Sequence, residues 1–146
     1  ELTDPTSKMS GTNSPDAGVI LLSDEPKRIV KKIKSAVTDA EMEIRYDPEH
    51  KPGVSNLLVI QSALTGVPVA TLEAGYAGQG YGALKGQVAE VVVAAVEPFQ
   101  KRMAELLGDP AELDRILATG AERAGAVSAA TLARVKDRMG LLPAVR

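Results

Sequence analysis

Residues 82–107 read GALKGQVAEVVVAAVEPFQKRMAELL, and this stretch decides the fold class. Its apolar side chains recur every three or four residues, which is the spacing of one face of an α-helix. These positions are Leu84, Val88, Val91, Val92, Ala95, Val96, Phe99, Met103, Leu106 and Leu107. We therefore predict one long helix, with a kink at Pro98 and with Phe99 in the core.

Two helices are predicted before this one. Ser23 or Asp24 is expected to cap the first helix, and Pro26 falls in its first turn, where the missing N–H costs nothing. The apolar positions of this first helix are Ile29, Val30, Ile33 and Val37. The second helix is predicted over residues 54–64, with Gly66 as its C-terminal stop.

The other segments complete an all-α pattern, since none of them shows a convincing alternation of period two. Residues 68–75 are predicted as a short helix before a Gly-rich turn, and Asp109-Pro110 is predicted to begin the last helix. Residues 1–18 are rich in Gly, Ser, Thr, Asn and Pro, and are read as a mobile loop. The predicted fold is a bundle of four to five helices behind a flexible N-terminal loop.

Composition excludes several classes of site. Cysteine is absent, and His50 is the single imidazole, so disulfides and a multi-His metal site are ruled out and no metal is expected. The net charge of −2 gives no global attraction to nucleic acid or membrane. No apolar run approaches the roughly 20 residues needed to span a bilayer. A cytoplasmic protein is the expectation.

Motifs along the whole chain point to one family. Lys8-Met9-Ser10-Gly11-Thr12 follows Asp4-Pro5-Thr6-Ser7. Further segments follow in order: Thr38-Asp39, Ile44-Arg45-Tyr46-Asp47, Lys51-Pro52-Gly53-Val54-Ser55-Asn56-Leu57-Leu58, Gly80-Tyr81-Gly82-Ala83-Leu84-Lys85 and Gly120-Ala121-Glu122-Arg123-Ala124. Their order and spacing resemble bacterial tryptophanyl-tRNA synthetases, which are class I aminoacyl-tRNA synthetases, from the KMSKS-type loop onward.

The resemblance implies two parts with different tasks. Residues 1–22 would form the nucleotide-loop segment, in which Lys8, Met9 and Ser10 bind ATP when a nucleotide-binding domain is present. Residues 23–146 would form a helical anticodon-binding domain. The intact enzyme uses ATP with Mg to charge tRNA(Trp), so the implied partners are tRNA(Trp) and the nucleotide-binding half. This chain alone is expected to hold no catalytic residue, to need no cofactor and to activate no tryptophan.

One position departs from the family's pattern. The family has a second Lys where this chain has Gly11, although Thr12 keeps a hydroxyl at the next position. Losing one charge-assisted contact to the phosphates is worth about 2–4 kcal/mol in the transition state. Gly11 therefore favours a rival reading, in which the chain is a stand-alone synthetase-like protein without catalysis.

Clustered cations supply the RNA-binding candidates, since neutralising phosphates releases counterions. The cationic candidates are Lys27, Arg28, Lys31, Lys32, Lys34, Arg45, Lys101 and Arg102, and Tyr46 is a candidate for stacking on a base. The competing interpretation of the first five is the solvated face of a helix. For the cations of the last two helices, salt bridges within the helix are the expectation.

Other charged residues are assigned to solvated loops. His50 lies in the charged stretch Asp47-Pro48-Glu49-His50-Lys51, where no nucleophile has a sensible spacing, so no catalytic role is expected. The acidic residues Asp39, Glu41, Glu43, Asp47 and Glu49 do not match an EF-hand and are read as a solvated loop.

Three functions remain open on this basis. The first is the tRNA-binding C-terminal part of a tryptophan–tRNA ligase. The second is a non-catalytic synthetase-like protein that binds tRNA or a protein partner. The third is a structural or dimerising helical module, which the net charge of −2 and the few aromatic residues favour. The oligomeric state stays open.

Overall fold

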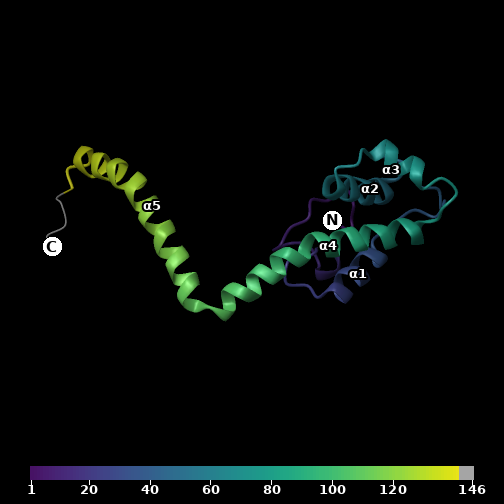
Figure 1. Cartoon of the computed structure of the whole chain (residues 1–146). Helices are drawn as coiled ribbons and strands as arrows, with labels where there is room; N and C mark the ends of the chain where they lie inside the picture. Colours follow the sequence, from purple (N-terminus) through teal and green to yellow (C-terminus); the bar gives the residue numbers. More distant parts are fainter. Residues whose placement is uncertain (142–146) are drawn as a thin grey trace. The chain divides into compact units, whose positions relative to one another are not determined.

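The computed structural model describes residues 1–141, and within them the chain forms five α-helices and no strand (Figure 1). The helices are α1 (Pro26–Ser35), α2 (Pro52–Thr65), α3 (Val69–Gly75), α4 (Tyr81–Gly108) and α5 (Pro110–Arg138), and a 3₁₀ turn, η1, covers Asp16–Gly18. The all-α prediction is confirmed. The last five residues of the predicted anticodon-binding domain, 142–146, lie outside the described residues.

The chain divides into two compact units, Glu1–Lys101 and Arg102–Arg146. The first unit contains one apolar core, made by α1, α2, α4, Leu2, Ile44 and Tyr76. In Figure 1, α2 and α3 lie on one side of the N-terminal part of α4, and α1 lies on the other. The predicted functional division at residue 22 stays a prediction.

Local sequence explains most of the helix ends. Pro26, Pro52 and Pro110 stand in the first turns of α1, α2 and α5, where the missing N–H costs nothing. Gly66 ends α2 in the left-handed conformation, at φ 73°. Asp109 caps α5, because its carboxylate accepts the Glu112 backbone N–H at 3.1 Å. These features are those predicted for these helices, except that α2 begins at Pro52, two residues before the predicted start at residue 54.

Two predictions near α1 and α4 are wrong. Neither Ser23 nor Asp24 caps α1: the N-cap is Glu25, without a side-chain hydrogen bond, and Asp24 is drawn instead into a buried ion pair. Phe99 is 62% exposed rather than part of the core. It follows Pro98 on α4, beyond Val96, which is the last α4 residue in the core cluster.

The second unit holds the end of α4 and all of α5. No residue of α5 is buried, and its apolar side chains, such as Leu117, Val127 and Leu132, are exposed. Arg115 pairs with Glu112 at 2.7 Å and Arg102 with Glu105 at 3.0 Å, so the expectation of salt bridges within these helices is confirmed for these two cations among the described residues.

Candidate nucleotide loop and nucleic-acid interface

The N-terminal segment is a loop with a fixed neck. The backbone N–H of Leu2 donates to the Gly18 carbonyl at 3.0 Å, and Val37 donates to the Leu2 carbonyl at 2.8 Å. Leu2 is almost fully buried, and Val19 is buried at the other side of the neck. Residues 3–17 therefore leave the core at Leu2 and rejoin it at Gly18, which lies beside Leu2. The mobility predicted for residues 1–18 is thus expected only between these two residues.

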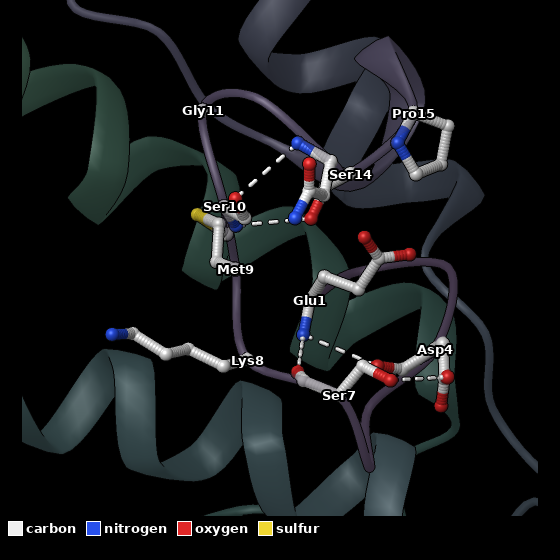
Figure 2. Close-up of a pocket in the computed structure, with 10 residues that line it drawn as sticks. Glu1, Asp4, Ser7, Lys8, Met9, Ser10, Gly11, Ser14 and Pro15 are labelled. Carbon is white, nitrogen blue, oxygen red and sulfur yellow. Dashed lines mark hydrogen bonds between the residues drawn. The ribbon is translucent and has the colours of Figure 1, made fainter.

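The three predicted nucleotide-binding residues lie on the outer part of this loop. They line an open cavity of about 830 Å³, together with Asp4 and Ser14 (Figure 2). Lys8 is exposed, and its side chain extends away from Asp4. Ser10 is held in place, because its backbone N–H donates to the Ser14 hydroxyl at 2.9 Å.

The charge in this cavity is mixed. Lys8 is the single cationic side chain among the described residues that line it. Asp4 lines the same cavity, and hydrogen bonds from the Ser7 and Thr6 hydroxyls lower the pKa of its carboxyl. A phosphate in this cavity would therefore meet one cationic side chain, the loop's hydroxyls and N–H groups, and the carboxylates of Glu1 and Asp4. Gly11 lies on this cavity without adding a charge.

Lys32, one of the five basic residues predicted for α1, does not face solvent. Its ammonium donates to Asp24 at 2.7 Å, to the Val19 carbonyl at 2.9 Å and to Asp16 at 3.2 Å. The side chains of Lys32 and Asp24 are only 5% and 2% exposed. The prediction that Lys32 contacts RNA is wrong, because its ammonium is occupied by three acceptors. All three lie in residues 16–24, the segment that leads from the loop into α1.

Arg28 and Asp24 complete this ion-pair cluster. Arg28 contacts Asp16 at 2.7 Å and Asp24 at 3.2 Å. Burial raises the pKa of Asp24, but the hydrogen bonds from Lys32 and from the Leu21 backbone outweigh it, so the pKa is lowered overall. The carboxylate is thus charged at neutral pH, as its two cationic partners require.

The remaining cations of α1 form one exposed face. Lys27, Lys31 and Lys34 are separated by four and three residues, so they lie along the same side of the helix. All three are exposed, and no ion pair within residues 1–141 involves them. At a rise of 1.5 Å per residue the face is about 10 Å long. The predicted set of five therefore separates into three exposed cations outside any ion pair of the described residues and two, the exposed Arg28 and the buried Lys32, that pair with Asp16 and Asp24.

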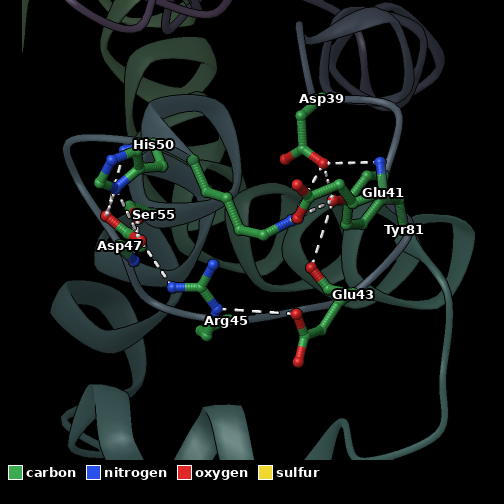
Figure 3. Close-up of polar contacts among 9 residues, drawn as sticks. Asp39, Glu41, Glu43, Arg45, Asp47, His50, Ser55 and Tyr81 are labelled. Atoms are coloured by element: carbon green, nitrogen blue, oxygen red, sulfur yellow. Dashed lines mark hydrogen bonds and ion pairs between the residues drawn. The ribbon is translucent and has the colours of Figure 1, made fainter.

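Lys51 is the buried member of a polar cluster that the sequence did not suggest, and its partners Asp39, Glu41 and Tyr81 are labelled in Figure 3. The side chain is 1% exposed, and its ammonium contacts Glu41 at 2.7 Å and Asp39 at 3.0 Å. The Tyr81 hydroxyl accepts from Lys51 and donates to Asp39. Burial alone would lower the pKa of Lys51, but the contacts with Glu41, Asp39 and Tyr81 raise it above its usual value.

Asp39 is the acidic centre of that cluster. Burial raises its pKa, but hydrogen bonds from Tyr81, the Glu41 backbone and Lys51 lower the pKa to about 2. Reading Asp39 as part of a solvated acidic loop is therefore wrong. The sequence signal for this cluster is that Asp39, Lys51 and Tyr81 each fall in one of the quoted motifs, whereas Glu41 lies outside them.

Several of those motifs meet at one backbone segment, residues 36–39. Lys85 donates to the Ala36 carbonyl at 2.8 Å, and a Cβ added at Gly53 would lie 2.1 Å from the Val37 carbonyl oxygen. Asp39 receives Lys51 and Tyr81 at the end of the same segment. The shared motifs thus hold α1, α2 and α4 together, which is a structural task.

The other predicted contacts have different surroundings. Arg45 pairs with Asp47 at 2.5 Å, while Tyr46 beside it is 42% exposed. The backbone N–H of His50 and the Arg45 guanidinium lower the pKa of Asp47, whose carboxylate also contacts the exposed His50 ring at 3.1 Å (Figure 3). Lys101 and Arg102 on α4 are both exposed.

Two features are absent from the described residues. No group of three or more His, Cys, Asp and Glu side chains within residues 1–141 is arranged to hold a metal ion. None of the individual helices described has the length and apolar character of a membrane span, whereas α2 and α3 meet the criterion only as a pair bent by 112°.

Known proteins place the chain in a family. Residues 1–97 match the family described as "tRNA synthetases class I (W and Y)". The chain belongs to the class I tRNA synthetases. Within this synthetase family, the tryptophan–tRNA ligase of Mycobacterium leprae is 59% identical over 143 residues, which are 98% of this chain and 42% of that protein. Tryptophan–tRNA ligase 2 of Streptomyces avermitilis is 56% identical over 99% of this chain and 43% of its own length.

A solved synthetase supports the same placement. The crystal structure of tryptophanyl-tRNA synthetase from Mycoplasma pneumoniae is similar to this fold, with a TM-score of 0.82 and 33% sequence identity. The similarity covers 97% of this chain and 43% of that structure. The resemblance to bacterial tryptophanyl-tRNA synthetases is thus confirmed, and this synthetase chain spans less than half the length of the curated relatives it matches.

Proposed function

We propose that this chain is the tRNA-binding C-terminal part of a tryptophan–tRNA ligase. The observation that carries the proposal is the similarity to these ligases over nearly all of the chain, at 59% identity to one of them. With a nucleotide-binding part, the enzyme would use ATP and Mg to charge tRNA(Trp) in the cytoplasm. The 146 residues alone would not activate tryptophan.

The loop would bind the phosphates of ATP. Lys8 is exposed and lies beside Ser10, so its ammonium can reach a phosphate chain that enters the open cavity. A fixed ammonium and a hydroxyl stabilise charge that moves onto leaving pyrophosphate. Residues 1–22 would provide this segment, and residues 23–146 would form the anticodon-binding domain.

The Lys27, Lys31 and Lys34 face of α1 would bind the RNA backbone. These cations are exposed, and α1 carries a high density of positive charge while the chain as a whole is at −2. Arg45, Tyr46, Lys101 and Arg102 are further candidates. The Tyr46 ring is exposed enough to stack on an unpaired base, which is how proteins hold bases of single-stranded loops.

Binding of tRNA(Trp) to the full chain, measured at several salt concentrations, tests this proposal. A companion tRNA with an altered anticodon shows whether the anticodon is recognised. Lys27→Gln, Lys31→Gln and Lys34→Gln should each weaken binding and reduce the salt slope by about one. Arg115→Gln is a matched control, since Arg115 is an exposed cation already paired with Glu112. Salt-independent or absent binding would contradict the proposal.

Gly11 supports a second candidate function, a synthetase-like protein that binds tRNA or a protein partner without catalysis. Tryptophan-dependent pyrophosphate exchange separates the two when the full-length protein is assayed. Activity that Lys8→Gln abolishes supports the ligase. Anticodon-sensitive tRNA binding without exchange supports the second function.

A further inference from the structure

A groove free of polar surface lies beside the nucleotide loop. It has a volume of about 330 Å³ and is lined by Ile33 of α1, Leu64 of α2 and Val96 of α4, among other apolar residues. From the loop segment, Met9 and Ile20 line it as well. The groove therefore joins three helices of the first unit to the segment that carries the proposed nucleotide-binding residues.

Met9 lies between the apolar groove and the polar cavity of the loop. It lines the apolar groove and also the polar cavity that contains Lys8 and Ser10. Met9 is 37% exposed, so more than half of its surface is covered although it is exposed, as is the neighbouring Lys8. A Cβ added at Gly11 would meet no atom within 4 Å. Of the residues from Lys8 to Gly11, Met9 is the one that lines the apolar groove.

We infer that Met9 is a positioning residue that holds the nucleotide loop on the helices through this groove. Methionine suits such a task, since its unbranched thioether side chain adapts to irregular apolar surfaces and can leave them again. While Met9 stays in the groove, the loop keeps its position on the helices and Lys8 stays exposed at the cavity that it lines. The inference deepens the proposed function of the loop and rests on it.

Limited trypsin digestion of the full chain measures the seating directly. Cleavage after the exposed Lys8 reports opening of the loop, because proteolysis follows the population of the open form when opening is fast. Cleavage after Lys32, which is buried in α1, reports unfolding of the core in the same sample. The amount of peptide 1–8 released over time, determined by mass spectrometry, gives the rate of cleavage after Lys8.

Shortening an apolar side chain on the loop or on the groove should speed cleavage after Lys8. Met9→Ala should speed cleavage after Lys8 by about five- to tenfold, since Met-to-Ala changes remove apolar contacts and Met9 is only partly covered. Met9→Leu should restore the original rate. Leu64→Ala, from the groove side of α2, should also speed it. Val59→Ala is the matched control, because Val59 is on the same helix and 45% exposed, against 47% for Leu64, but does not line the groove.

The outcomes separate this inference from the proposed function. An unchanged rate in Met9→Ala, or equal rates in Leu64→Ala and Val59→Ala, overturns the inference. A rise in cleavage after Lys32 in step with cleavage after Lys8 also overturns it, because the effect is then unfolding. No nucleotide is present in these digests. Failure of ATP to bind the full-length enzyme would contradict the function of the loop and leave the seating of Met9 intact.

Discussion

Replacing Lys32 by Met should destabilise the fold strongly, although Lys32 belongs to a set of surface-like basic residues in the sequence. The ammonium satisfies Asp24, Asp16 and the Val19 carbonyl, and the Asp24 side chain is 2% exposed. Breaking one side of a buried ion pair costs about 3–5 kcal/mol. Arg28 stays within 3.2 Å of Asp24 and the Leu21 backbone still donates to it, so we expect the lower end, about 3 kcal/mol.

Urea unfolding followed by circular dichroism measures this loss. At a slope of about 2 kcal/mol per M, the midpoint of Lys32→Met should fall by about 1.5 M. Lys31→Met is the matched control, since it removes the neighbouring exposed lysine of the same helix and should change stability by less than about 0.5 kcal/mol. Equal midpoints for the two variants would refute the buried-pair reasoning.

A double variant tests the pairing itself. Adding Asp24→Asn to Lys32→Met removes the uncompensated charge and leaves an oxygen for the Leu21 N–H. The double variant should therefore be more stable than Lys32→Met alone. Additive losses would mean that the two residues stabilise the protein independently of each other.

Two further predictions concern the segment 36–39. Asp39→Asn should lower stability at pH 7, because the pKa of Asp39 in the folded state, about 2, lies below its ordinary value of 3.8. This contribution is present above pH 3.8 and is lost as pH falls toward 2, so the thermal unfolding curves of wild type and variant should converge there. Gly53→Ala should destabilise the chain by about 2 kcal/mol or more, because its Cβ would meet the Val37 carbonyl at 2.1 Å, while Gly11→Ala should change thermal stability little; similar melting temperatures for these two variants would contradict the close approach of α2 to residue 37.

Periodicity and punctuation predict the helices well. The apolar spacing from Leu84 to Val96 and the stop at Gly66 are local features, and α4 and the end of α2 follow them. The burial of a residue is harder to predict when its environment depends on segments that are distant in the sequence. Phe99 continues the apolar pattern of α4 in the sequence, yet it lies outside the core, because a helix can extend beyond the elements that cover its apolar face.

The burial of charged residues is also not predictable from the local sequence. Lys32 and Lys31 are adjacent on one helix, and nothing local distinguishes the buried one from the exposed one. The difference arises because Asp16 and Asp24 approach only one side of α1. Likewise, Lys51 and Asp39 are twelve residues apart and meet with Tyr81 only in three dimensions.

The neck between Leu2 and Gly18 has a consequence for how this protein can change over evolutionary time. The loop meets the core at two fixed points, and a side chain at Gly11 would touch nothing. Loop length also carries a small penalty, about 0.6 kcal/mol for each doubling. Substitutions and insertions at the tip therefore cost little folding free energy. Position 11 can change in a lineage while the helices that carry the loop stay the same.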